Sequence, residues 1–175
     1  SSTKEGEHAD AYFLNYSLSN YLSQVGVFNV CFGGGEPTLY KGNYTSTLAT
    51  ILQSYKDRGF VTSFTTKNYN MHKLSNFSKI IEHADAIAIS ANTLEELAKA
   101  HELKKHISES GQRCSVYVQT ILELLPWEET LQWFEEARKH HFQGITFLGY
   151  KSFGFGVNET PNAVPDDWFQ QFKKR

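Results

Sequence analysis

The sequence contains only two cysteines among 175 residues and lacks any long apolar run. A membrane-spanning helix needs about 18 or more consecutive apolar residues, and the polar residues 1–7 do not resemble a secretory signal peptide. Two cysteines are also too few for a disulfide framework. We therefore expect a reduced, cytoplasmic protein with no membrane partner.

Each cysteine, Cys31 and Cys114, stands inside an apolar, strand-like run. A free cysteine in such a run usually packs as a small hydrophobic side chain. We therefore expect both to be buried.

The sequence also lacks an excess of positive charge, since 17 Lys and Arg residues face 19 Asp and Glu residues. This balance gives no indication of a nucleic-acid partner. His-Glu-x-x-His, paired-cysteine and catalytic-triad patterns are missing too, and the seven histidines lie mainly on expected helices. The sequence thus does not indicate a metalloprotease, a zinc site or a hydrolase.

The hydrophobic pattern alternates between helices and short strands. Expected strands cover residues 27–32, 60–66, 86–90, 115–122 and 145–149. The first helix is expected at residues 8–25, and the second carries Tyr44, Leu48, Ile51, Leu52 and Tyr55 and ends at Gly59. A third carries Leu74, Phe77, Ile80 and Ile81, a fourth opens with a capping box of Thr93 and Glu96, a fifth starts at Pro126, and a last begins near Asp166.

Strands that recur at intervals of roughly 30 residues, each separated by a helix, indicate an α/β domain with a parallel sheet. Two architectures fit this pattern, a complete or partial barrel and a doubly wound open sheet. In both, ligands bind at the carboxyl ends of the strands. The residues that follow each strand are therefore the candidate site.

The first strand ends in Gly33, Gly34 and Gly35, followed by Glu36 and Pro37. Glycine lets the main chain approach a ligand closely, because it has no Cβ. A bare backbone edge beside a fixed carboxylate suits a small ligand with a cationic amine. The spacing matches neither a phosphate-binding loop nor the G-x-G-x-x-G dinucleotide motif.

Polar residues follow the other strands as well. They are the cluster at residues 65–70, Ser90 with Asn92, Gln119 with Thr120, and Gly149 with Tyr150. Helix capping or turn formation explains each of them equally well, and Asn92 and Thr93 are especially open to that interpretation. Gln119 must either find a buried partner or face the interior of a barrel.

The segment Gly34, Gly35, Glu36 and Pro37, placed after a parallel strand, resembles the GGEP motif of radical S-adenosylmethionine (radical SAM) enzymes. The resemblance extends over about residues 8–156 and implies a partial (β/α) TIM-like barrel that lacks its first strand. It also implies that the whole of residues 1–175 is one truncated core domain. No initiator methionine is present, which likewise suggests a piece of a longer protein.

The resemblance implies that Gly34, Gly35, Glu36 and Pro37 hold the methionyl amino group of S-adenosylmethionine. Ser90, Gln119, Gly149 and Tyr150 are then expected to face its ribose, carboxylate and adenine. For these four residues the argument rests on position at a strand end, not on a motif.

Family members also bind a 4Fe-4S cluster through cysteines spaced C-x-x-x-C-x-x-C, and this sequence has no such motif. The resemblance implies that the full-length parent cleaves S-adenosylmethionine reductively and forms a 5′-deoxyadenosyl radical that abstracts hydrogen from a substrate. We expect the present chain to be catalytically inert on its own and to self-associate through its unpaired sheet edge. The alternatives are a binding module for S-adenosylmethionine without a cluster, and an unrelated βα-barrel enzyme that binds an anion at the Gly-rich turn.

Overall fold

The computed structural model describes residues 8–43, 46–150 and 161–174, which form an α/β fold around one parallel sheet. Its strands are β1 (Asn29–Phe32), β2 (Val61–Thr66), β3 (Ala86–Ser90), β4 (Ser115–Ile121) and β5 (Gly144–Leu148). Each strand pairs with the next one in the sequence, in the order β1-β2-β3-β4-β5. A doubly wound sheet would reverse this order at a switch point, so the fold is the predicted partial barrel.

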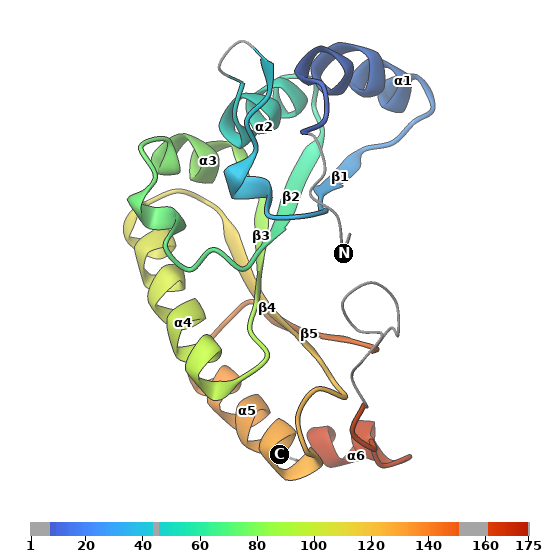
Figure 1. Ribbon diagram of the computed structural model, residues 1–175, viewed down its shortest axis with the longest axis vertical. Coiled ribbons are helices and arrows are strands. Elements are labelled where there is room, and N and C mark those ends of the chain that lie inside the picture. Colours follow the sequence, from blue (N-terminus) through green and yellow to red (C-terminus); the bar gives the residue numbers. More distant parts are fainter. Residues whose placement is uncertain (1–7, 44–45, 151–160, 175) are drawn as a thin grey trace.

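Helices connect the strands and form an arc along one side of the sheet, as Figure 1 shows for α2 to α5. The α-helices are α1 (Ser19–Gln24), α2 (Leu48–Lys56), α3 (Phe77–His83), α4 (Leu94–Glu109), α5 (Trp127–Lys139) and α6 (Trp168–Lys173). Shorter or irregular turns are the π-helix η1 (Phe13–Leu18) and the 3₁₀-helices η2 (Pro37–Leu39) and η4 (Met71–Lys73). None of the helices in these ranges has both the length and the apolar character needed to cross a membrane.

The core lies between the sheet and the helices. Alternate side chains of β2, β3 and β4 are buried there, and Ile87, Ile89 and Trp133 are fully enclosed. Successive residues of a strand point to opposite faces, so the intervening side chains lie on the other face, which we call the inner face. These residues are exposed or half-buried: Cys31, Ser63, Thr65, Ala88, Ser90, Tyr117, Gln119 and Thr146.

The expected strands are confirmed to within two residues at each end. The first one begins later, at Asn29, because the chain is still leaving α1 through Gly26, which has φ +78°. Pro37 opens only the three-residue η2, and the second helix starts at Leu48. Tyr44, expected on that helix, lies outside the described residues.

Polar side chains of Lys56, Thr62 and Asp85 join the helices and strands at the amino-terminal edge of the sheet. Asp85 accepts a hydrogen bond from the Thr62 N–H (2.9 Å) and pairs with the Lys56 ammonium. Burial alone would raise the pKa of this carboxyl, but the bonds from Lys56 and Thr62 hold it below its usual value. Because ligands bind at the opposite edge of such sheets, this cluster stabilises the fold.

Candidate functional site

The Gly-rich turn after β1 presents its main chain to open space. Gly34 has φ +84° and Gly35 has φ +38°, a region that residues with a Cβ rarely adopt. A Cβ added at Gly33, Gly34 or Gly35 would meet no atom within 4 Å. Gly34 and Gly35 are therefore required by backbone conformation, and the space beside all three glycines remains open for a ligand.

The Glu36 carboxylate is held in place by donors at or just after the ends of two strands, β1 and β2. Its Oε1 accepts hydrogen bonds from the Thr38 N–H (3.1 Å), the Thr38 hydroxyl (2.7 Å) and the Thr66 hydroxyl (2.7 Å). Its Oε2 accepts one from the Lys67 N–H (2.9 Å). A carboxylate offers about four acceptor positions, so within the described residues Oε2 keeps a lone pair for a further donor.

The donors to Glu36 are themselves fixed. Thr66 is buried with 1% exposure, and its hydroxyl oxygen accepts from the Asn68 N–H (3.0 Å). The Asn68 side-chain amide donates to the Thr38 hydroxyl (2.9 Å). Hydrogen bonds to an ionised group are the stronger kind, and here they connect the ends of β1 and β2 through one carboxylate. Pro37, the other residue of the predicted motif, is buried at the start of η2.

Ser90 and Gln119, two of the predicted site residues, are brought together by the register of β3 and β4. The Gln119 side-chain amide donates to the Ser90 hydroxyl (2.9 Å) across the inner face. The Tyr69 hydroxyl donates to the Ser90 carbonyl (2.7 Å). Burial, followed by the nearby Glu96 charge, raises the pKa of Tyr69, so this phenol remains a donor.

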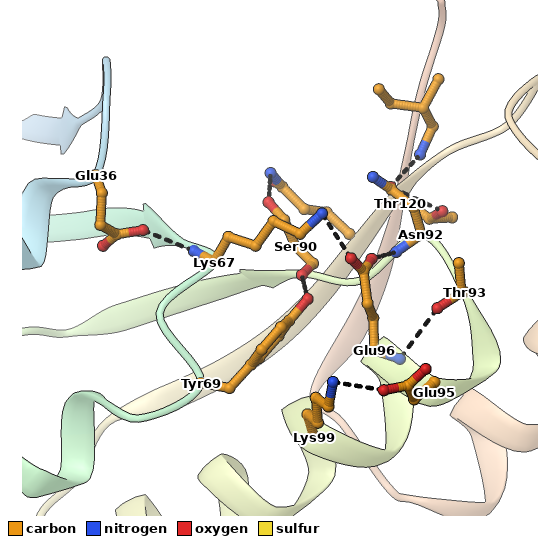
Figure 2. Close-up of polar contacts among 12 residues, drawn as sticks. Glu36, Lys67, Tyr69, Ser90, Asn92, Thr93, Glu95, Glu96, Lys99 and Thr120 are labelled. Atoms are coloured by element: carbon orange, nitrogen blue, oxygen red, sulfur yellow. Dashed lines mark hydrogen bonds and ion pairs between the residues drawn. The ribbon is translucent and has the colours of Figure 1, made fainter.

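A second network joins the ends of β2, β3 and β4, as Figure 2 shows. The Lys67 ammonium pairs with Glu96 Oε1 at 2.6 Å, and Glu96 Oε2 accepts from the Asn92 N–H at 2.7 Å. Asn92 Oδ1 then accepts from the Thr120 hydroxyl and the Ile121 N–H, each at 3.3 Å. Sequence reasoning named Asn92 and Thr120 only as strand-end residues and Glu96 only as a capping residue, and it gave Lys67 no specific role.

Gly149 and Tyr150, the last two predicted site residues, follow β5. The Tyr150 N–H donates to Glu123 Oε2 (2.9 Å), in the connection between β4 and α5. A Cβ at Gly149 would meet no atom within 4 Å. The structure therefore places both residues at the expected edge of the sheet, after β5.

The prediction that Cys31 is buried is wrong. Cys31 is exposed, because it belongs to the edge strand β1 and alternates with the partly buried Val30 and Phe32. Cys114 is half-buried, and both thiols are free. An iron–sulfur cluster is held by several thiolates, and the described residues hold no group of three or more metal-ligating side chains. The residues of this chain therefore do not fit a 4Fe-4S cluster.

A cavity of about 1030 Å³ lies away from this edge. It is lined by α5 and the start of β5, including Phe134, Arg138 and Gly144. Because ligands of parallel α/β folds bind at the carboxyl ends of strands, we place the candidate site at the Glu36 turn.

Solved structures share this fold. SuiB from Streptococcus suis bound to its precursor peptide SuiA superimposes with a TM-score of 0.75 at 15% sequence identity. SuiB bound to S-adenosylmethionine does so with a TM-score of 0.69 at 14% identity. Each comparison covers 98% of this chain and 39% of SuiB, so the chain spans about two fifths of that protein.

A truncated 3-deoxy-D-arabino-heptulosonate 7-phosphate synthase from Thermotoga maritima is also similar, with a TM-score of 0.55 and 17% identity over 95% of this chain and 57% of the synthase. No protein-family model matches the sequence, and no curated protein matches it. At these identities the likeness shows a common barrel-type fold.

Proposed function

We propose that the chain binds S-adenosylmethionine at the carboxyl ends of its strands and is the core of a radical SAM enzyme. The observation that carries this proposal is the Glu36 carboxylate, fixed by four hydrogen bonds beside an open glycine backbone. The GGEP resemblance and the fold shared with SuiB, which has been solved with S-adenosylmethionine, support it.

The methionyl ammonium of the ligand is the group that best matches this turn. An ammonium has three donors and no acceptor, so it suits backbone carbonyls and the remaining lone pair of Glu36 Oε2. Bonds between an ammonium and a carboxylate are charge-assisted. The four bonds that Glu36 already accepts keep the carboxylate in one orientation before the ligand arrives, which lowers the ordering cost of binding.

Ser90, Gln119, Gly149 and Tyr150 are proposed to contact the ribose, carboxylate and adenine of the same ligand. Support for Ser90 and Gln119 comes from their shared place on the inner face, where their bond uses one of the two amide hydrogens of Gln119 and no second acceptor lies among the described residues. For Gly149 and Tyr150, only the position after β5 supports the assignment.

The radical chemistry that the resemblance implies requires a 4Fe-4S cluster, which would supply the electron for cleavage of the sulfonium. Since the residues of this chain do not fit that cluster, we assign no step to it here. We propose instead that the thiolate ligands belong to another segment of the parent protein, and that the parent works in the reducing cytoplasm.

The alternative of an anion at the Gly-rich turn is less well supported. Glu36 places a negative charge there, and the Lys67 ammonium is neutralised by Glu96 at 2.6 Å. The three-residue η2 is too short to supply a helix dipole for an anion.

Titration calorimetry on the 175-residue chain tests the proposal. The ligands are S-adenosylmethionine, inorganic phosphate, and 5′-methylthioadenosine, which lacks the amino-acid part. Loss of one charge-assisted bond predicts about a tenfold or greater loss of S-adenosylmethionine affinity in Glu36→Gln. The affinity for 5′-methylthioadenosine should not change, because that ligand has no ammonium.

Glu95→Gln serves as the control, because it makes the same Glu-to-Gln change at a carboxylate that pairs with Lys99 in solvent. Equal losses for both adenosine ligands in Glu36→Gln would contradict the assignment of Glu36. Preferential binding of phosphate would favour the anion-binding alternative.

A further inference from the structure

Glu96 departs from the role that its position predicts. At the third residue of α4, in a capping box, its carboxylate should accept from the N–H of Thr93. The Thr93 hydroxyl does accept from the Glu96 N–H (3.1 Å), which confirms half of the predicted box. The Glu96 carboxylate instead accepts from the Asn92 N–H and pairs with Lys67. The Glu96 side chain is 22% exposed and that of Lys67 is 52% exposed, so the carboxylate end of the pair is partly shielded from water.

Lys67 contacts the carboxylates of Glu36 and Glu96 in different ways. Its main-chain N–H donates to Glu36 Oε2, and its side-chain ammonium pairs with Glu96 Oε1. Figure 2 shows the long Lys67 side chain running from the Glu36 end of the network toward Glu96. The same residue therefore fixes the carboxylate of the proposed ligand site and carries a cation that Glu96 holds away from it.

The charge of the proposed ligand makes this arrangement important. S-adenosylmethionine has a sulfonium and an ammonium against one carboxylate, so it carries a net positive charge. A lysine ammonium without a partner near the Glu36 turn would repel that charge and compete for the carboxylate, whereas a paired lysine does so much less.

We propose that Glu96 is a positioning residue that makes the edge selective for a cationic ligand by holding and neutralising the Lys67 ammonium. This inference rests on the proposed function. It goes further by naming a source of charge selectivity outside the GGEP turn, in a residue that does not contact the ligand. Asn92 supports it, because it ties Glu96 to the end of β4 and so restrains the position of its carboxylate.

The test compares two ligands that differ in one charge. S-adenosylhomocysteine has the amino-acid and adenosine parts but lacks the methyl group and the sulfonium charge. Calorimetry gives the dissociation constants of both for the wild-type chain, Glu96→Gln, Lys67→Met, and the double variant. The selectivity is the dissociation constant of S-adenosylhomocysteine divided by that of S-adenosylmethionine.

In Glu96→Gln we expect this selectivity to fall about threefold to tenfold at low salt, and the effect to shrink when salt is raised. Adding Lys67→Met should restore it, because the released cation is then gone. A merely structural role for Glu96 would weaken both ligands alike, and Lys67→Met would not rescue the ratio. Glu95→Gln is the control, because its pair with Lys99 is solvent-exposed on both sides.

The outcomes separate the two proposals. A wild-type chain that binds neither ligand overturns the proposed function, and this inference with it. Binding of both ligands with an unchanged ratio in Glu96→Gln overturns the inference alone. A fallen ratio that Lys67→Met does not restore also overturns it.

Discussion

Replacing Thr66 by valine tests whether Glu36 is held by the protein before any ligand binds. Valine keeps the shape of threonine but removes the hydroxyl, which donates to Glu36 Oε1 at 2.7 Å and accepts from the Asn68 N–H at 3.0 Å. A hydrogen bond to a charged group contributes about 1.5–3 kcal/mol and a neutral one about 0.5–1.5 kcal/mol. Since Thr66 is buried, water cannot replace either partner, and we expect a loss of about 2–4 kcal/mol.

Urea unfolding measures this change as a shift in midpoint at constant slope. The matched control is Thr65→Val, one residue earlier on the half-buried inner face, where no hydrogen bond of the threonine hydroxyl is found among the described residues. The control should shift the free energy of unfolding by less than about 0.5 kcal/mol. Equal effects of the two substitutions would refute the reasoning.

A double-mutant cycle with Glu36→Gln isolates the pair itself. Residues that share a hydrogen bond show coupling of about 0.5–3 kcal/mol, whereas independent residues add. We therefore expect the double variant to lose clearly less stability than the sum of the single variants. Strict additivity would mean that Thr66 acts on the fold without acting through Glu36.

Three further predictions concern the rest of the molecule. A maleimide should modify Cys31 in the folded chain long before Cys114, because burial raises the pKa of Cys114 to about 12, and equal rates by mass spectrometry would count against this. Burial and the neighbouring His140 lower the pKa of His101 in the folded chain. As the pH drops below about 6.5, the unfolded chain therefore binds this proton first, and the free energy of unfolding should fall. His101→Gln should flatten this part of the pH profile of urea unfolding. Phe28, 74% exposed beside the edge strand β1, should promote self-association of the isolated chain. Phe28→Ser should then lower the apparent mass measured by light scattering. A monomer in both forms would contradict association through this edge.

The fold was largely predictable because its signals are local. The spacing of hydrophobic residues distinguishes helices from strands, Gly59, Gly111 and Gly144 mark the boundaries between them, and together they locate each strand within two residues. The hydrophobic pattern alone does not choose between a barrel and a doubly wound sheet, because it is the same in both, and the barrel was predicted from the resemblance of residues 34–37 to the GGEP motif. The pairing of β1 with β2, and of each later strand with the next, confirms it.

The error at Cys31 has a related cause. Apolar runs in parallel sheets usually mean burial on both faces, but β1 has one neighbour in the described sheet and its Asn29 and Cys31 are exposed. Burial therefore depends on the place of the strand in the sheet, which the sequence of the strand does not carry.

The candidate site was predictable only in its first element. The Gly-Gly-Glu-Pro turn is visible because all its residues are adjacent, whereas the partners of Glu36 come from about one helix later in the chain, at Thr66 and Lys67. The contact between Lys67 and Glu96 spans a further strand and could not be foreseen from capping rules, which assign Glu96 to the N–H of Thr93.

The charges at this edge account for why so many polar groups meet there. Glu36 must stay ionised and keep an open lone pair to receive a cation, yet an unsupported carboxylate between two strand ends would be costly to bury. Neutral donors from Thr38, Thr66 and the Lys67 main chain stabilise it without adding positive charge. The Lys67 ammonium, a cation that the described residues place in this network, pairs with Glu96. Because Glu36 is stabilised by neutral hydrogen-bond donors and Lys67 is paired with Glu96, this edge of the sheet still attracts a positively charged ligand.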